Sequence, residues 1–156
     1  MNFSIIPLYN GKKAKIYTIQ FSDKELSEYE QFVYENMTIV PDAVRTLRTQ
    51  LKKISFQRGL ADNFFKRESP EPYRVFRIEE TKEDLRLYCI KFSGVAIVLG
   101  GGGIKIPGKV KLIENPHLNV ICELLIKIED LINERILTKE IIITNDDLKG
   151  NLNFEI

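Results

Sequence analysis

The chain has 156 residues, 44% hydrophobic and 29% charged, a composition typical of one globular domain that excludes a disordered tail or a fibre. The formal net charge is +1, but residues 123–156 hold 4 basic and 8 acidic side chains, which leaves +5 on residues 1–122. We therefore expect a basic body with an acidic C-terminal tail, and a basic body is a hint of a polyanionic partner.

The composition also bears on location and cofactors. Cys89 and Cys122 are too few for a disulfide scaffold. No apolar run approaches the roughly 18 residues that span a bilayer, and the lysines follow the apolar residues 1–8, the reverse of a secretory signal. We therefore expect a cytoplasmic protein that has no contact with the membrane. Because no cysteine or histidine pair has the usual ligand spacing, we expect neither a metal nor a cofactor.

The first predicted elements are a strand over residues 15–21, where β-branched and aromatic side chains alternate, and two helices. Ser22 and Glu25 match a capping box, which predicts that the first helix begins there. Pro41 suits the first turn of the second helix, and Gly59 ends that helix or lies just beyond it. We expect the two helices to form an antiparallel pair lying on a sheet.

The middle of the chain is predicted to be mostly strands. Residues 61–72 are polar and contain two prolines, which predicts a loop. Three strands are expected after it, the last two joined by a Ser-Gly turn, over residues 73–78, 85–92 and 95–99. A two-residue link of this kind predicts an antiparallel hairpin.

The last predicted helix begins at Asn115-Pro116, with Asn115 as its N-cap, and the tail holds one short strand-like run, residues 140–144. The order β-α-α-β-β-β-α predicts an α+β fold with two N-terminal helices and a C-terminal helix on a small antiparallel sheet. We expect one domain over residues 1–137 and an acidic tail over 138–156, which forms an edge strand or a flexible end. One face of the sheet would remain partly open and suit a binding groove.

The runs YRVFRI, LRLYCIKF and VAIVLGGGGIK, followed by a C-terminal helix, resemble the core of the RelE/ParE/HigB toxins of bacterial toxin–antitoxin modules. In that pattern a strand bearing an arginine pairs with an apolar strand that ends in glycine and a basic residue. The resemblance covers residues 15–135. It implies a RelE-like fold, a helix-turn-helix antitoxin as partner, and the cutting of messenger RNA on the ribosome.

The implied reaction is a metal-independent attack of the RNA 2′-hydroxyl on the neighbouring phosphate. It requires groups that accept and donate a proton, and cations around the phosphate. The resemblance places Arg86 and Lys105 at the cationic positions, and His117 and Tyr88 are the candidate proton-transfer groups, with Tyr73 as a further candidate. Further contacts with phosphate or RNA are expected from Arg74, Arg77, Lys109 and Lys111.

Two features depart from the family pattern. Residues 105–114 contain no tyrosine or histidine, although the family often has one near that position, and the net charge is only +1. Two alternatives therefore stand beside the endonuclease: a non-catalytic binding module on the same fold, and a gyrase-directed toxin of the ParE type. Separately, residues 103–109 have the spacing of a nucleotide-binding loop, but Val110 occupies the Ser/Thr position that would hold magnesium, so we do not expect a nucleotide site there.

Overall fold

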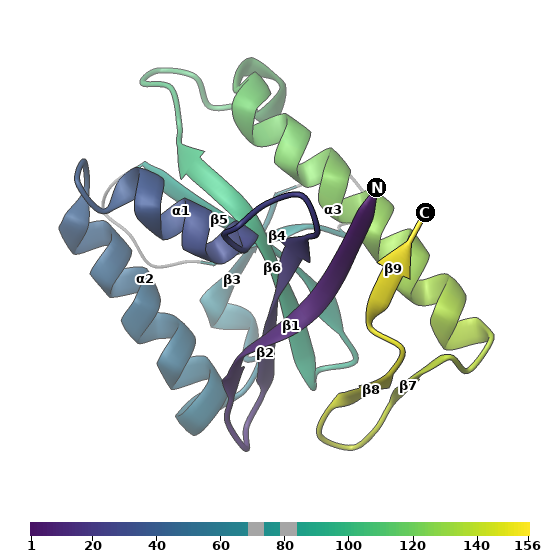
Figure 1. Ribbon diagram of the computed structural model, residues 1–156. Helices are drawn as coiled ribbons and strands as arrows, with labels where there is room; N and C mark the ends of the chain where they lie inside the picture. Colours follow the sequence, from purple (N-terminus) through teal and green to yellow (C-terminus); the bar gives the residue numbers. More distant parts are fainter. Residues whose placement is uncertain (69–73, 79–83) are drawn as a thin grey trace.

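The computed structural model describes residues 1–68, 74–78 and 84–156 (Figure 1). Within these residues the strands form a seven-stranded sheet in the order β3-β4-β5-β6-β2-β1-β9 and a two-stranded sheet, β7-β8. The helices α1 and α2 lie on one side of the large sheet and α3 on the other (Figure 1). The elements are, in chain order, β1 (Asn2–Asn10), β2 (Lys15–Phe21), α1 (Glu28–Asn36), α2 (Pro41–Lys53), β3 (Phe65–Arg67), β4 (Phe76–Ile78), β5 (Leu85–Phe92), β6 (Ala96–Ile104), α3 (Pro116–Leu137), β7 (Ile141–Ile143), β8 (Leu148–Gly150) and β9 (Asn153–Glu155).

The predicted small antiparallel sheet of order β-α-α-β-β-β-α, like that of the RelE toxins, is wrong, although the protein is α+β. The sheet has seven strands and is mixed, because β2 pairs with β6 in parallel, with Lys15 opposite Ala96. Three strands of this sheet were not anticipated: β1, which forms a hairpin with β2, β3 in the predicted loop, and β9, which pairs with β1. The sheet is therefore larger than the one that the resemblance implies. The strand β8, which pairs with β7 in the two-stranded sheet, was not anticipated either.

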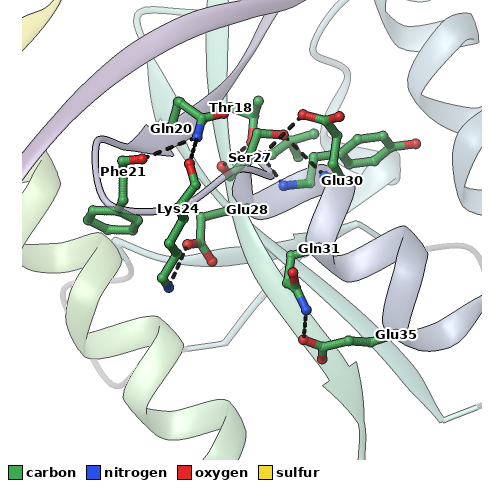
Figure 2. Close-up of polar contacts among 11 residues, drawn as sticks. Thr18, Gln20, Phe21, Lys24, Ser27, Glu28, Glu30, Gln31 and Glu35 are labelled. Atoms are coloured by element: carbon green, nitrogen blue, oxygen red, sulfur yellow. Dashed lines mark hydrogen bonds and ion pairs between the residues drawn. The ribbon is translucent and has the colours of Figure 1, made fainter.

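The helix α1 begins later than the sequence predicts. The capping box is formed by Ser27 and Glu30, not by Ser22 and Glu25: the Ser27 hydroxyl accepts from the Glu30 backbone N–H, and the Glu30 carboxylate accepts from the Ser27 N–H (Figure 2). Both pairs fit the same spacing, so the motif alone does not choose between them. The buried Thr18 hydroxyl, which accepts from the N–H of Tyr29, also holds this end of α1 against β2.

The predicted beginning and end of the second helix are both confirmed. Pro41 is the first residue of α2, and the helix passes into a π-helical segment, Ile54–Arg58, that ends at Gly59 with φ of 75°. The side chains that α2 buries are spaced three and four residues apart, and they pack with α1 against the sheet: Val44, Leu47, Leu51 and Ile54. This helix is the lower-left element in Figure 1.

Both faces of the sheet are covered, so the predicted open face is wrong. Under α1 and α2 the core contains Leu87, Cys89 and Leu99, which are 0% exposed. On the other side α3 buries its apolar stripe, made of Leu118, Cys122, Leu125, Ile128 and Ile132, against alternate residues of the same strands. A functional site on the sheet therefore has to lie at the ends or edges of its strands.

The strand β5 occupies residues 85–92 as predicted, but β6 continues through the glycines to Ile104 instead of ending at Leu99. Leu87 lies opposite Gly102 and Cys89 opposite Leu99, so two glycines face the single residue Tyr88, which is a β-bulge. Tight packing explains why glycine is required here, because a Cβ on Gly102 would lie 1.8 Å from the Arg86 carbonyl oxygen.

Candidate phosphate-binding strip

The structure brings Arg86, Lys105 and His117 together at one end of the β5-β6 hairpin. Arg86 lies opposite Gly103 in the antiparallel register, and a Cβ on Gly103 would lie 3.5 Å from the His117 ring. Residues directly opposite one another project to the same face, so Arg86 projects towards the α3 side of the sheet. Together with Glu68, Arg77 and Asp84 these residues form what we call the charged strip.

Arg86 lies in the middle of the charged strip. The predicted alternation along β5 is confirmed, since Tyr88 and Ile90 belong to the core under α3 whereas Leu85 and Leu87 belong to the core under α1 and α2. Arg86 is half-buried, and its side chain donates to the Leu85 carbonyl at 3.4 Å.

Lys105 follows β6 directly and lies across from Asp84. Its backbone N–H donates to the Asp84 carbonyl at 2.8 Å, which continues the ladder by one step beyond β6. Its ammonium lies 4.0 Å from the Asp84 carboxylate, and its side chain is only 16% exposed. Because alternate residues along a strand are about 7 Å apart, Lys105 and Arg86 are close enough for adjacent phosphate oxygens or adjacent phosphates.

His117 is the second residue of α3 and has a fixed tautomer. Its Nε2 lies 2.7 Å from the Ile104 carbonyl oxygen, which only accepts hydrogen bonds, so Nε2 carries the hydrogen. In the neutral ring Nδ1 then holds a lone pair, and the side chain is exposed. His117 is therefore the residue of the charged strip that is best arranged to accept a proton from a bound hydroxyl.

Glu68 was missed by the sequence analysis. It follows β3, and its carboxylate accepts from Arg77 at 3.3 Å while its side chain is 12% exposed. Burial raises the pKa of Glu68, an effect that Arg77 and Arg86 only partly oppose. Glu68 lies in a segment that the sequence predicts to be a loop. The only sequence pattern that could have indicated its ion pair with Arg77 is the alternation of charged residues at Lys66 and Glu68.

Tyr88 does not join the exposed part of this site. Tyr88 is 1% exposed in the core under α3, and burial raises its pKa. The phenol therefore remains protonated near neutral pH and packs as a core side chain. Tyr73 lies outside the described residues.

Arg74 and Arg77 have carboxylate partners. Arg74 donates to Glu129 and to Asp130 on α3, each at 2.5 Å, and so joins the segment before β4 to the helix. Arg77 is opposite Tyr88 in the β4-β5 register and bonds Glu68. A phosphate contact by Arg74 would therefore compete with its two ion pairs to α3. Arg77 belongs to the charged strip and holds Glu68 in place through their ion pair.

Lys109 and Lys111 are exposed in the connection between β6 and α3. Asn115 organises this connection, because its buried side chain accepts from the Ile106 N–H and donates to the carbonyls of Lys109 and Lys111. The predicted capping bond by Asn115 is absent, although Pro116 does begin α3 as expected. Asn115 thus fixes the loop that leads from Lys105 to His117.

The described residues contain no group of three or more His, Cys, Asp or Glu side chains that could hold a metal ion. Cys89 and Cys122 are free and buried, and burial raises the pKa of each thiol to about 12, so neither is a thiolate near neutral pH. In the part of the chain that is described, no helix combines the length and the apolar character needed to cross a bilayer.

Comparisons of the chain with protein-family models, with curated proteins and with solved structures found no match. The site is therefore interpreted from its own chemistry. It offers two half-buried cations, an arginine held by a carboxylate, and an exposed histidine with a free ring nitrogen.

Proposed function

We propose that the protein is an RNA-binding toxin of a toxin–antitoxin module that cuts messenger RNA on the ribosome by metal-independent transesterification. The observation that carries this proposal is the register of β5 and β6, which puts Arg86 opposite Gly103, where an added Cβ would meet the His117 ring, and one step from Lys105. Guanidinium and ammonium groups gathered in this way suit a phosphate, and the neighbouring imidazole suits proton transfer.

In the proposed reaction the RNA 2′-oxygen forms a bond to phosphorus while the bond from phosphorus to the 5′-oxygen breaks. The products are a 2′,3′-cyclic phosphate and a 5′-hydroxyl. Arg86 and Lys105 stabilise the charge on the phosphate oxygens as it develops. His117, through Nδ1, and Glu68 are the two titratable groups that exchange protons with the attacking and leaving oxygens.

The proposal includes a helix-turn-helix antitoxin as the protein partner, and a cytoplasmic location follows from a target on the ribosome. An antitoxin that neutralises the toxin would cover the charged strip. Asp84 and Glu68 already pair with Lys105 and Arg77, so an antitoxin that places acidic side chains there would replace contacts of the same kind.

The test is expression of the wild type and of an Arg86→Ala/Lys105→Ala variant in bacteria, with growth and the 5′ ends of cellular messenger RNA as readouts. We expect the wild type to arrest growth and to leave cuts at codon boundaries, and we expect the variant to lose both by about 100-fold or more. Lys127→Ala/Lys149→Ala is the matched control, because both lysines are exposed and lie outside the charged strip.

The result also separates the other candidates. Equal growth with wild type and variant, together with intact RNA, contradicts the endonuclease. DNA damage with intact transcripts indicates a gyrase-directed toxin.

A non-catalytic binding module is the second candidate, and one observation favours it. Tyr88 is sealed in the core, so one of the two proton-transfer groups expected from the sequence is absent from the exposed part of the site. This candidate predicts that the protein binds RNA through Arg86 and Lys105 and leaves it uncut. A His117→Ala variant that binds and arrests growth like the wild type would support it against the endonuclease.

A further inference from the structure

A second cationic surface lies on the side of the molecule opposite the charged strip. The helix α2 carries Arg45, Arg48, Lys52 and Lys53 against a single acid, Asp42. All four cations lie outside the buried face of the helix, which packs on the other side of the sheet from α3. The neighbouring helix α1 is acidic, so the positive charge is confined to α2 and its continuation.

The exposed face of α2 contains a depression of about 220 Å³ lined by side chains that donate hydrogen bonds. They are Arg45, Thr46, Thr49, Gln50 and Lys53. The spacing of these residues puts them on one face of the helix, beside the stripe that faces the core. Arg45 is held at 3.2 Å from Asp42, but both side chains are largely exposed, so this pair contributes little and is easily exchanged for another anion.

Gln50 adds an uncharged hydrogen-bonding group to this depression. The residue is 6% exposed, and its side-chain amide makes no hydrogen bond with any residue in the described ranges. No buried side-chain nitrogen or oxygen atom of the described residues lacks a partner, so the amide atoms of Gln50 are open to the depression that they line. A ligand oxygen in the depression can therefore accept a hydrogen bond from this amide.

The positive surface continues past α2 and ends at an exposed aromatic ring. The backbone N–H of Lys13 donates to the Ser55 carbonyl, which joins the basic β1-β2 turn to the π-helical segment. Phe56 projects from that segment with 54% of its surface exposed, and its ring contacts Tyr9 edge to face at 6.3 Å. The β1-β2 turn and the chain on either side of Phe56 also contribute exposed cations, namely Lys12, Lys13, Lys52 and Arg58.

We infer that this α2 surface binds single-stranded nucleic acid. The depression takes one backbone phosphate between Arg45, Lys53 and Gln50, the flanking cations follow the next phosphates, and a base stacks on Phe56. Cationic grooves that carry an exposed aromatic ring are the usual means of binding a single strand without reading its sequence. A helix of 13 residues is about 20 Å long, which matches several nucleotides of a strand.

The experiment measures the fluorescence anisotropy of a labelled oligouridylate of about 12 nucleotides with 2′-O-methyl groups, which cannot be cut, at salt from about 50 mM to about 200 mM. We expect Arg45→Glu/Lys53→Glu to weaken binding at least tenfold and to lower the slope of log K against log salt by about 1.4, because each phosphate contact on a single strand contributes about 0.7.

Phe56→Ala separates stacking from charge. It should weaken binding about fivefold or more and leave the salt slope unchanged, since the ring carries no charge. The matched control is Lys127→Glu/Lys149→Glu, which changes the net charge by the same amount at exposed positions outside α2. Circular dichroism establishes that each variant is folded.

Three results would overturn the inference: equal loss in the α2 variant and in its control, tighter binding of a duplex of the same length, or tighter binding of anionic lipid vesicles. The inference does not depend on the proposed function. If the charged strip binds no RNA, Arg86→Ala/Lys105→Ala binds the oligonucleotide like the wild type, whereas Arg45→Glu/Lys53→Glu is still weakened. If both surfaces bind RNA, the wild type binds two strands and each variant binds one, because the surfaces lie on opposite sides of the sheet.

Discussion

At the scale of a single residue, two effects act on the pKa of Glu68 in opposite directions: burial raises it and the neighbouring arginines lower it. It accepts from Arg77, which favours the carboxylate, but it is mostly removed from water, which favours the protonated acid. Burial is the larger effect, so the pKa of Glu68 is raised above its usual value of 4.5. An acid of this kind holds its proton closer to neutral pH than an exposed one, as a proton-transfer group must.

The same raised pKa makes the free energy of unfolding depend on pH. Below the unfolded value of 4.5 the carboxyl is protonated in both states, and this contribution to stability is fully present. As pH rises through the folded pKa the contribution is lost, because the unfolded chain gives up its proton first. We therefore expect the wild type to lose stability relative to Glu68→Gln as the pH rises above about 4.5, measured by urea denaturation. A difference that is constant or grows in favour of the wild type would contradict this, and Glu134→Gln, at an exposed position, is the control.

The candidate site was predictable from the sequence only where its residues are neighbours in a hairpin. The Ser-Gly turn predicted that residues 85–92 pair with the strand that follows, and this pairing places Arg86 near Lys105. Glu68 reaches the site through β3, a strand of three residues in a polar segment, and its partner Arg77 comes from another short strand. Contacts across such short strands depend on the completed sheet and have no local pattern.

At the scale of elements, the predictions that are confirmed are those for helices and strands with enough residues to show several repeats of the apolar pattern. The strands β2 and β5 have seven and eight residues, and α2 and α3 have thirteen and twenty-two, long enough for the apolar repeat to be unambiguous. The strands β3 and β9 have three residues each, which shows less than two periods of alternation. The strand β1 was missed for another reason: its burial alternates regularly only near Phe3 and Ile5.

The bulge in β6 leads to a prediction about glycine. A Cβ on Gly102 would lie 1.8 Å from the backbone oxygen of Arg86, which cannot move without breaking the β5-β6 ladder. We expect Gly102→Ala to lower the free energy of unfolding by about 1–3 kcal/mol or more and to displace Arg86. The neighbouring Gly101→Ala is the control, because its nearest contact would be a side-chain atom at 3.5 Å and the expected change is within about 1 kcal/mol. Equal stability of the two variants in urea denaturation would contradict this account.

At the scale of the whole molecule, the acidic tail is a structural part of the sheet. The strand β9 pairs with β1 at the edge opposite β3, and Ile141, Leu148 and Phe154 are buried in the core under α3. The Phe154 ring stacks on Phe3 at 4.7 Å and lies beneath the Arg135 guanidinium at 3.7 Å. These contacts hold the tail at the far edge of the sheet from Arg86.

We therefore expect Phe154→Ala to cost about 3–5 kcal/mol of unfolding free energy, as the loss of a fully buried aromatic side chain does. Ile142→Ala is the control from the same tail, because 54% of Ile142 is exposed, and it should change stability by less than about 1 kcal/mol. Thermal and urea unfolding of both variants check the difference. A Phe154→Ala variant as stable as the wild type would mean that the tail packs only loosely.

The parallel pairing of β2 with β6 has a consequence for the order in which the chain is made. Residues 15–18 have to find residues 96–99 as neighbours. At about 5–20 residues per second, the first partner waits roughly 4–16 s on the ribosome before the second is synthesised. During that interval the hydrogen-bonding groups along β2 face the cellular milieu, where another nascent chain could capture them.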